Sequence, residues 1–511
     1  MNKALHNVSK SDFEKRWPLF SGLGTVGGVF HNYGFAVVSK DPVFYIRKGY
    51  SQIVKNNRAY FRKNDSLSLK TGTVSILYVI PVHQYDFLLA VRSYRHENGN
   101  MDIKKLLEFA QYEHEQHIED MQIGKNVSFK DFQSPFEQAD DAFFSMKVGN
   151  YLDALDRIKK DEDVYRLDKL SMELYLQAMS AYSSFIADDS AAGKYWRKFS
   201  NTDSLDSFNR SVSFEPVNDS VINKWSKYQV VMFNESHVNT RGRLGMAYLL
   251  KQFADKGFKY FAMEAINEND TVINERGAPD LESGFYTREY NMANLIRAAK
   301  HAGFQLVAYE QDEDQTGDRE LEQAQNLYRK TIQHDSAAKV LVFAGWGHIF
   351  KNKSSLGRKL MAQQFWNISG IEPFCIDQTF YSPHTRSTTK TPPAGLSVIH
   401  GAFSKEDYVD EYIYNNLDAD HIAYLGGDTA TYKTVQIKIP EIKERSNNET
   451  LLLCIYPKKE YDAIKLPVPC YIKKITSEKK IELKMLPGDY VWYIRSAGVR
   501  DMFNADLTVT E

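Results

Sequence analysis

Between residues 221 and 380, short apolar runs alternate with longer amphipathic segments, and this alternation constrains the fold more than any other feature of the chain. Short apolar runs bounded by turn residues are typical of buried strands, whereas apolar residues at helical spacing indicate helices. The predicted strands are residues 228–233, 260–263, 305–309, 339–344 and 373–376. The predicted helices are residues 243–256, 287–302, 319–334 and 355–366. This alternation predicts a parallel sheet covered by helices.

The 511 residues divide by composition into four regions. Residues 1–100 mix strand-like, aromatic-rich segments with turns and have no assigned role. Residues 101–220 follow the helical period, and residues 221–390 form the α/β region. Residues 391–511 carry strand-like runs separated by turns, which predicts a small antiparallel β domain with an accessory or binding role. We therefore expect an α/β core with a parallel sheet, a helical segment, and a C-terminal antiparallel β domain.

Three short motifs lie outside the α/β region. Residues 142–155 resemble part of a tetratricopeptide unit, with Gly149 and Tyr151 at the turn between two helices, so a protein partner could bind this segment. The pair His114 and His117 has helical spacing but no third ligand, and a solvated charged face is the favoured interpretation. The glycines of residues 22–27 fit a dinucleotide-binding spelling, but no strand precedes them, which favours a glycine-rich turn.

Composition excludes several classes of protein. The chain carries 43% hydrophobic residues, too many for wholesale disorder, and its net charge of −2 gives no electrostatic case for binding nucleic acid. Its three cysteines form no metal-ligand pattern, although Cys454 and Cys470 could form one disulfide. We expect no transmembrane segment. The beginning of the chain lacks an apolar leader, so a cytoplasmic protein and an exported mature form both remain open.

Acidic and imidazole side chains follow every predicted strand of the α/β region. Ligands bind beyond the carboxyl ends of parallel strands, so these side chains should converge on one place. In strand order the set is Glu235 and His237, Glu264, Glu310 and Asp312, His348, and Asp377. The next helices begin at the same edge of the sheet and bring Arg241 or Arg243, Arg288 and Arg319.

Each of these residues has a structural alternative. His237 could cap the next helix, and His348 could be a buried histidine bonded to a carbonyl. Glu310 opens an acidic loop that could simply be solvated, and the arginines could neutralise acids as part of the core. The pairing of Glu235 with His237 after an apolar run favours a catalytic role. So does the close approach that Gly345 and Gly347 allow beside His348.

A carboxylate directly after the apolar run 260–263 would be costly without a partner, so Glu264 should also be functional. We interpret Glu235, His237, Glu264 and His348 as catalytic residues, and Arg288, Glu310 and Arg319 as substrate-binding residues.

These motifs resemble a superfamily that joins erythromycin esterase-like proteins, the haem-binding lipoprotein ChaN and the TIKI/TraB metalloprotease-like proteins. The similar stretches are Asn234-Glu-Ser-His237, Ala262-Met-Glu264 and Gly345-Trp-Gly-His348, within residues 225–380. Residues 318–326 resemble an arginine-bearing helix of the esterase-like branch, with Gln323 at a methionine position. Asn234 stands where the superfamily usually has glycine. The resemblance implies a metal-free esterase, a metal-dependent peptidase or a haem binder.

The first hypothesis is therefore an enzyme, a hydrolase acting on an ester or a peptide. In its metal-free form, His237 activates water, Glu235 or Glu264 orients it, and His348 or Arg319 stabilises the oxyanion. In its metal form, His237, His348 and Glu264 hold a divalent ion. No Gly-x-Ser-x-Gly element occurs, which leaves Ser236 as the one candidate serine nucleophile. The alternatives are a haem-binding or other ligand-binding protein, or a surface adaptor with an inactive core.

Overall fold

The computed structural model describes six strands within residues 22–96, and then residues 134–145, 149–166, 169–200, 206–207, 212–311, 318–351, 359–381, 386–387, 393–401, 408–442 and 449–511. The chain separates into two compact units: residues 1–142 with 156–178, and residues 143–155 with 179–511. His114, His117 and Asp312 lie outside the described residues.

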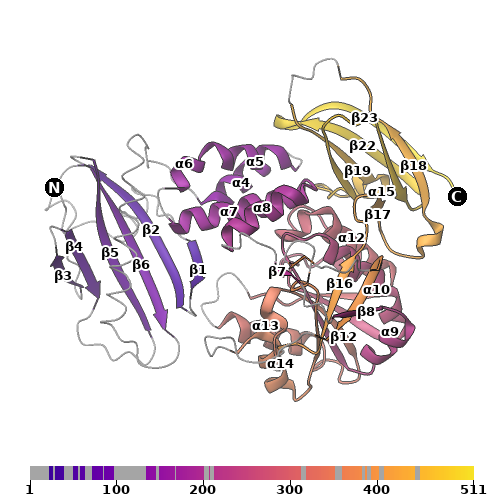
Figure 1. Ribbon diagram of the computed structural model, residues 1–511, viewed down its shortest axis with the longest axis horizontal. Helices are drawn as coiled ribbons and strands as arrows, with labels where there is room; N and C mark the ends of the chain where they lie inside the picture. The colour runs from indigo at the N-terminus through magenta and orange to yellow at the C-terminus, as the bar shows by residue number, and fades with distance from the viewer. Residues whose placement is uncertain are drawn as a thin grey trace. The chain divides into compact units, whose positions relative to one another are not determined.

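The first unit contains a six-stranded antiparallel sheet in the order β1-β2-β6-β5-β4-β3 (Figure 1). Its strands are β1 (Gly22–Val26), β2 (Val29–Ser39), β3 (Tyr50–Lys55), β4 (Arg58–Lys63), β5 (Gly72–His83) and β6 (Asp86–His96). The expectation of a glycine-rich turn at residues 22–27 is wrong, because Gly22–Val26 is an edge strand that pairs with β2. A strand that itself contains the glycines does not match a dinucleotide-binding loop, which requires a strand before the glycines and a helix after them.

The helical segment is confirmed within residues 134–200, whereas residues 101–133 lie outside the described residues. It comprises α4 (Pro135–Phe143), α5 (Tyr151–Lys160), α6 (Glu162–Tyr165), α7 (Lys169–Phe185) and α8 (Asp189–Phe199). Gly149 precedes α5, and a Cβ there would meet the Tyr151 ring at 2.9 Å and the Phe143 ring at 3.0 Å. The absence of a side chain thus lets the chain enter α5 against two aromatic rings. The tetratricopeptide-like repeat itself stays a prediction.

The α/β core of the second unit is a sheet in the order β11-β10-β12-β9-β13-β16-β15-β8. The strands from β11 to β16 are parallel, whereas β15 and β8 are antiparallel. Their bounds are β8 (Ser213–Pro216), β9 (Val230–Glu235), β10 (Phe258–Met263), β11 (Gln305–Ala308), β12 (Lys339–Gly345), β13 (Phe374–Asp377), β15 (Gly395–His400) and β16 (Glu411–Asn416). All five predicted strands are present, so the predicted parallel sheet is confirmed. The sheet also recruits β8, β15 and β16 from segments on either side of the predicted α/β region.

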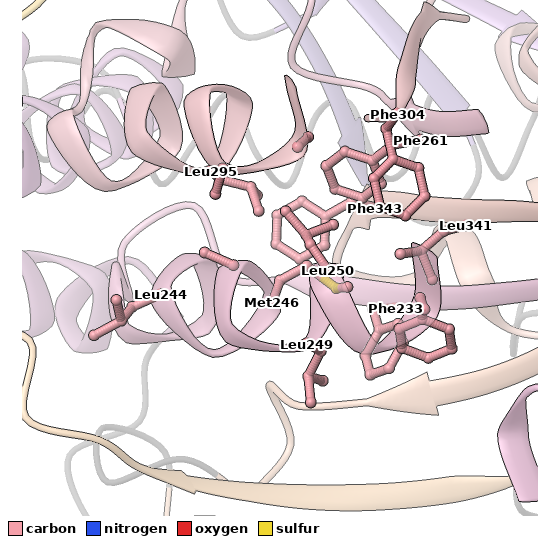
Figure 2. Close-up of a cluster of buried hydrophobic side chains, with 14 of the residues drawn as sticks. Phe233, Leu244, Met246, Leu249, Leu250, Phe261, Leu295, Phe304, Leu341 and Phe343 are labelled. Atoms are coloured by element: carbon pink, nitrogen blue, oxygen red, sulfur yellow. The ribbon is translucent and has the colours of Figure 1, made fainter. Parts of the chain in front are cut away.

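Helices cover both faces of this sheet, as the alternation of side chains along each strand requires. Val231 and Phe233 of β9 belong to one buried cluster, whereas Val230 and Met232 belong to another. The first cluster lies under α9 (Asp219–Trp225), α10 (Arg241–Asp255) and α12 (Tyr290–His301), and Figure 2 shows its aromatic centre. The second lies under α13 (Arg319–Lys330) and α14 (Met361–Ser369). The parallel strands β9, β10, β11, β12 and β13 therefore have apolar side chains on both faces.

The C-terminal β region is also confirmed. A four-stranded antiparallel sheet runs in the order β20-β19-β22-β23, beside a small sheet in the order β17-β21-β18. The strands are β17 (Ile422–Ala423), β18 (Lys433–Lys438), β19 (Leu451–Pro457), β20 (Tyr471–Ile475), β21 (Lys480–Met485), β22 (Gly488–Ser496) and β23 (Arg500–Val509). Cys454 and Cys470 are both buried free thiols, so the disulfide expected between them is absent. None of the helices that the structure describes is long and apolar enough to cross a bilayer.

Candidate active site

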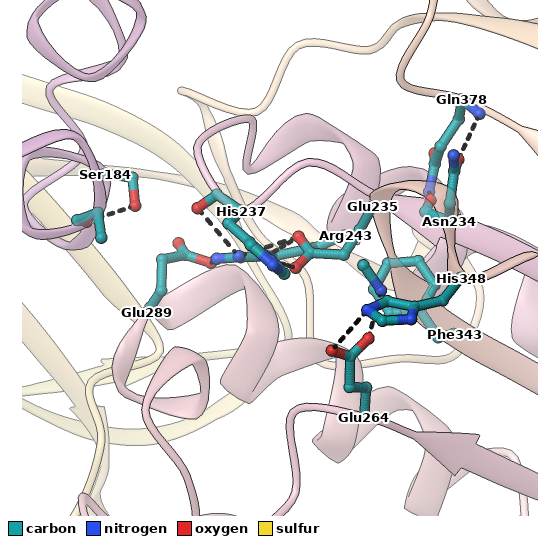
Figure 3. Close-up of polar contacts among 12 residues, drawn as sticks. Ser184, Asn234, Glu235, His237, Arg243, Glu264, Glu289, Phe343, His348 and Gln378 are labelled. Atoms are coloured by element: carbon teal, nitrogen blue, oxygen red, sulfur yellow. Dashed lines mark hydrogen bonds and ion pairs between the residues drawn. The ribbon is translucent and has the colours of Figure 1, made fainter. Parts of the chain in front are cut away.

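A pocket of about 600 Å³ opens at the carboxyl ends of the parallel strands. Six of the seven predicted site residues line it, and Figure 3 shows several of them around one space. The six are Glu235, His237, Glu264, Glu310, Arg319 and His348. The pairing of β12 between β9 and β10 explains this convergence, because it brings the ends of three strands side by side.

Glu235 and His237 form a carboxylate–imidazole dyad at the end of β9. Glu235 Oε1 lies 2.6 Å from His237 Nδ1, and the Glu235 side chain is only 4% exposed. The His237 side chain is 23% exposed at the pocket wall, and its ring stacks on Tyr286 with centroids 4.2 Å apart. A carboxylate on Nδ1 selects the tautomer in which Nε2 carries a lone pair. The dyad therefore presents Nε2 as a base.

The end of β12 is shaped around this imidazole. A Cβ on Gly345 would lie 2.6 Å from His237 Cε1 and 2.9 Å from Nε2, so only glycine allows the ring to reach its position. The next residue, Trp346, has a φ of 41°, a left-handed conformation that is rare for a bulky side chain. Its ring stacks on Trp196, with centroids 4.7 Å apart, and meets the His237 ring edge-on. Backbone strain is thus concentrated beside the dyad.

Behind the dyad lies a buried ionic network. Arg243 is fully buried and donates from Nε to Glu235 Oε2 at 3.0 Å and from Nη1 to Glu289 Oε2 at 2.9 Å. It also donates to the backbone carbonyl of His237. Burial alone would raise the pKa of Glu235, but the charges of Arg243 and His237 hold it below its ordinary value. Glu235 therefore stays ionised beside the imidazole.

Arg319 joins two further carboxylates of the pocket, Glu264 and Glu310. Its Nη2 donates to Glu264 Oε1 at 2.7 Å, and its guanidinium also pairs with both oxygens of Glu310. The second Glu264 oxygen accepts the backbone N–H of Gly345 at 2.6 Å. Burial alone would raise the pKa of Glu264, but His348 and Arg319 lower it to about 2. Glu264 is thus an anion that fixes the arginine.

His348 lies between two carboxylates. Its Nδ1 is 2.9 Å from Glu320 Oε2, and its Nε2 is 3.5 Å from Glu264 Oε1. Burial alone would lower the pKa of His348, but the charges of Glu264 and Glu320 raise it above its ordinary value. His348 therefore differs from His237 in its partners, because two carboxylates face its ring, whereas one carboxylate contacts His237 Nδ1.

Arg288 and Asp377 lie elsewhere. Arg288 is absent from the pocket lining, and its guanidinium lies 4.7 Å from the centroid of the Phe144 ring and 5.2 Å from that of Phe285. Its predicted place in the substrate site is therefore corrected: stacking of an arginine on aromatic rings accounts for the burial of this charge. Asp377 is buried and accepts the backbone N–H groups of Thr379 and Phe380, which makes it a turn cap.

The residues present do not fit a metal ion. Among the described residues, no group of three or more histidine, cysteine, aspartate or glutamate side chains is arranged to hold one. The guanidinium of Arg319 contacts Glu264 and lies 3.4 Å from His348 Nε2, so a fixed cation already occupies the space between two of the three predicted ligands. A second cation there would be repelled.

Sequence reasoning missed Glu289, Glu320 and Tyr286. Glu289 is the N-cap of α12 and Glu320 lies in the first turn of α13, and both look like ordinary acids at a helix N-terminus, where negative charge is common. Tyr286 precedes a helix and carries no motif. The short distance between these residues and the strand ends follows from how the helices pack back on the sheet, which the local pattern does not encode.

No family model matches the chain, and no curated protein sequence matches it. Among solved structures, the type III effector HopBA1 is similar at 12% identity and a TM-score of 0.28, over 41% of this chain and 99% of that chain. The C-terminal region of Pasteurella multocida toxin, whose crystal structures reveal a thiol-protease-like catalytic triad, is similar at 13% identity and a TM-score of 0.24. That match covers 45% of this chain and 34% of the toxin chain. Likenesses of this strength carry no argument about function.

Proposed function

We propose that the chain is a metal-free hydrolase of ester or peptide carbonyl groups, with His237 as the general base. The observation that carries this proposal is the 2.6 Å contact between Glu235 and His237 Nδ1, which leaves Nε2 at the wall of a pocket. In that position Nε2 takes a proton from water as the oxygen attacks the carbonyl carbon. The C–O bond of the ester or the C–N bond of the peptide then breaks, and the imidazolium gives its proton to the departing oxygen or nitrogen, which restores the base.

Arg319 and His348 in the pocket lining support the attack step of the reaction. Attack on a carbonyl places negative charge on its oxygen, and preorganised donors at that position lower the barrier. Arg319 Nη1 and His348 Nε2 lie 3.4 Å apart, and both residues line the pocket. Glu264 and Glu310 hold the arginine in place, so no reorganisation is needed when charge develops.

The proposal extends to the superfamily of erythromycin esterase-like, ChaN and TIKI/TraB proteins, and within it to the esterase-like chemistry. All three stretches that carry the resemblance contribute a residue to the pocket: Glu235 and His237, Glu264, and His348. Asn234 stands where the superfamily usually has glycine, and its side chain forms hydrogen bonds to neighbouring strand ends. Its side chain accepts the Gln378 N–H at 2.9 Å and donates to the Trp346 carbonyl at 2.9 Å.

A panel of ester, lactone and peptide substrates tests the proposal, with and without EDTA. His237→Ala and His348→Ala should each lose at least roughly 100-fold in turnover while remaining folded. His421→Ala is the matched control, because His421 is exposed and pairs only locally with Asp418. Unchanged turnover in His237→Ala would remove it as the base, and loss of activity in EDTA would favour the metal-dependent alternative.

A haemin titration tests the binding alternative that the resemblance also carries. Under the hydrolase proposal, adding haemin to the purified protein produces no Soret band of a specific complex. A stoichiometric Soret band together with no turnover on the whole panel would replace hydrolysis by haem capture.

A further inference from the structure

The carboxylate of Glu289 makes a contact beyond those of a helix N-cap. It is fully buried at the N-terminus of α12, where Oε1 accepts the Asn291 N–H at 2.8 Å and Oε2 accepts the Met292 N–H at 2.9 Å. Asparagine or serine would serve as well for capping alone, without the cost of burying a charge. The long carboxylate instead extends to Arg243, which donates to Oε2 at 2.9 Å.

Arg243 makes the connection to the dyad. Its guanidinium is planar, always charged and fully buried, and it spans two carboxylates and the His237 carbonyl at once. With Glu289 removed, the guanidinium would keep only one charged partner. Its orientation would then no longer be fixed from both sides, and neither would the Glu235 carboxylate that it holds.

We propose that Glu289 is a positioning residue for His237, acting through Arg243 and Glu235. The inference rests on the proposed role of His237 as a base. The chain of contacts runs from the N-cap of α12, through a buried guanidinium on α10, to the end of β9 (Figure 3). The helix terminus thereby fixes which side of the imidazole faces the pocket.

Two variants of the network test this inference. Glu289→Gln keeps a capping oxygen but removes the charge that faces Arg243, and Arg243→Lys keeps a charge but removes the planar fork. Each should lower kcat about 10- to 100-fold with KM unchanged, because the base is misoriented rather than the substrate site altered. Asn218→Ala is the control: it removes the cap of α9, which accepts two backbone N–H groups at an exposed position away from the pocket.

A spectroscopic measurement separates this inference from the proposed activity, since it needs no substrate. Deuterated protein carrying 13C at histidine Cε1 gives one signal per histidine, and His237→Gln assigns the signal of interest. In the wild type, this signal should be single and sharp at the position of the Nδ1–H tautomer. In Glu289→Gln and Arg243→Lys it should shift or broaden, whereas Asn218→Ala should leave it unchanged.

The outcomes are distinct. A His237 signal and a kcat that do not change in either variant overturn the inference, and leave Glu289 as a helix cap. Loss of folding in both variants, seen as the absence of a cooperative thermal transition, also overturns the inference, because the network would then be structural. A wild type without turnover on any substrate, but with the expected changes in the His237 signal, retains the positioning network and overturns only the hydrolase.

Discussion

At the scale of single residues, Gly345 sets the position of His237. Gly345→Ala would place a methyl carbon 2.6 Å from His237 Cε1, which is closer than a real Cβ contact allows. The imidazole must therefore move off Glu235, and we expect turnover to fall at least roughly 100-fold. Because overpacking also strains the fold, the free energy of unfolding should fall by about 1–3 kcal/mol. Steady-state kinetics and denaturant unfolding measure the two effects.

Gly347→Ala is the matched control two residues away. A Cβ there would meet the Phe350 ring at 3.3 Å, a contact that a small ring movement relieves, and it would not touch the dyad. Near wild-type turnover in Gly347→Ala, combined with a large loss in Gly345→Ala, is the expected pattern. Equal losses in both variants would show that the whole Gly345–His348 turn, rather than the space beside His237, limits activity.

The pKa of Glu264 makes stability depend on pH in a stated direction. Burial opposes its ionisation, but His348 and Arg319 lower the pKa from 4.5 to about 2. A carboxyl with a depressed pKa stabilises the folded state above its unfolded pKa, and this contribution is lost as pH falls toward the folded value. Above pH 5, wild type should exceed Glu264→Gln in stability by about 3 kcal/mol.

This difference should shrink as pH falls from about 4.5 to about 2. Melting temperatures of the two proteins across that range provide the measurement. The exposed residue Glu282 supplies the control, because Glu282→Gln should melt with the wild type at every pH. A gap between wild type and Glu264→Gln that stays constant down to pH 2.5 would contradict the role of Glu264 as an ionised partner.

Which residues could be predicted from sequence depends on how each reaches the site. Glu235, Glu264 and His348 lie at or just beyond strand ends, and parallel strands meet at one edge, so their convergence followed from the pattern. Arg288 lies just before a helix that begins at the same edge of the sheet. Its guanidinium nevertheless stacks on aromatic rings that are distant in sequence, such as Phe144. Periodicity describes one element at a time and contains no information on such partners.

At the scale of elements, Asn234 joins three of them. It lies at the end of β9, accepts the backbone N–H of Gln378 after β13, and donates to the carbonyl of Trp346 after β12. Asn234→Ala removes the partners of the buried Gln378 N–H and of the partly buried Trp346 carbonyl, which should cost about 1–3 kcal/mol of stability. Urea unfolding measures this cost.

The same change tests whether these elements hold the site. If Asn234 fixes the strand ends, Asn234→Ala should also lower turnover, since Glu235 follows it directly. Asn223→Ala on the exposed side of α9 should change neither property. Should Asn234→Ala match Asn223→Ala in stability, the interpretation of Asn234 as a junction residue would be wrong.

The order of the strands in the central sheet could not be predicted from the sequence. The five core strands were found because buried parallel strands are apolar on both faces. However, β12 lies between β9 and β10 although β10 follows β9 in the chain, and only long-range pairing decides this. The strands β8, β15 and β16 were not predicted, and their place in the central sheet depends on pairing with one another and with β13.

At the scale of the second unit, the C-terminal strands are joined to the α/β core through α12. Arg297 is almost fully buried, and donates to Glu460 at 2.7 Å and to the Val468 carbonyl at 2.7 Å. Asn294, one turn earlier, donates to the Cys470 carbonyl at 2.8 Å. The same helix bears Glu289 as its N-cap, so one element serves both the C-terminal strands and the dyad.

Arg297→Ala should therefore separate the folding of the two regions. Removing one partner of a buried ion pair typically costs about 3–5 kcal/mol, and here it also leaves the Val468 carbonyl without its donor. We expect one cooperative urea transition in the wild type and two in Arg297→Ala, with protease cleavage after residue 440 appearing at the first. Arg329→Ala, on the exposed face of α13, should keep one transition. A single transition at the wild-type midpoint in Arg297→Ala would mean that apolar packing alone joins the C-terminal strands to the core.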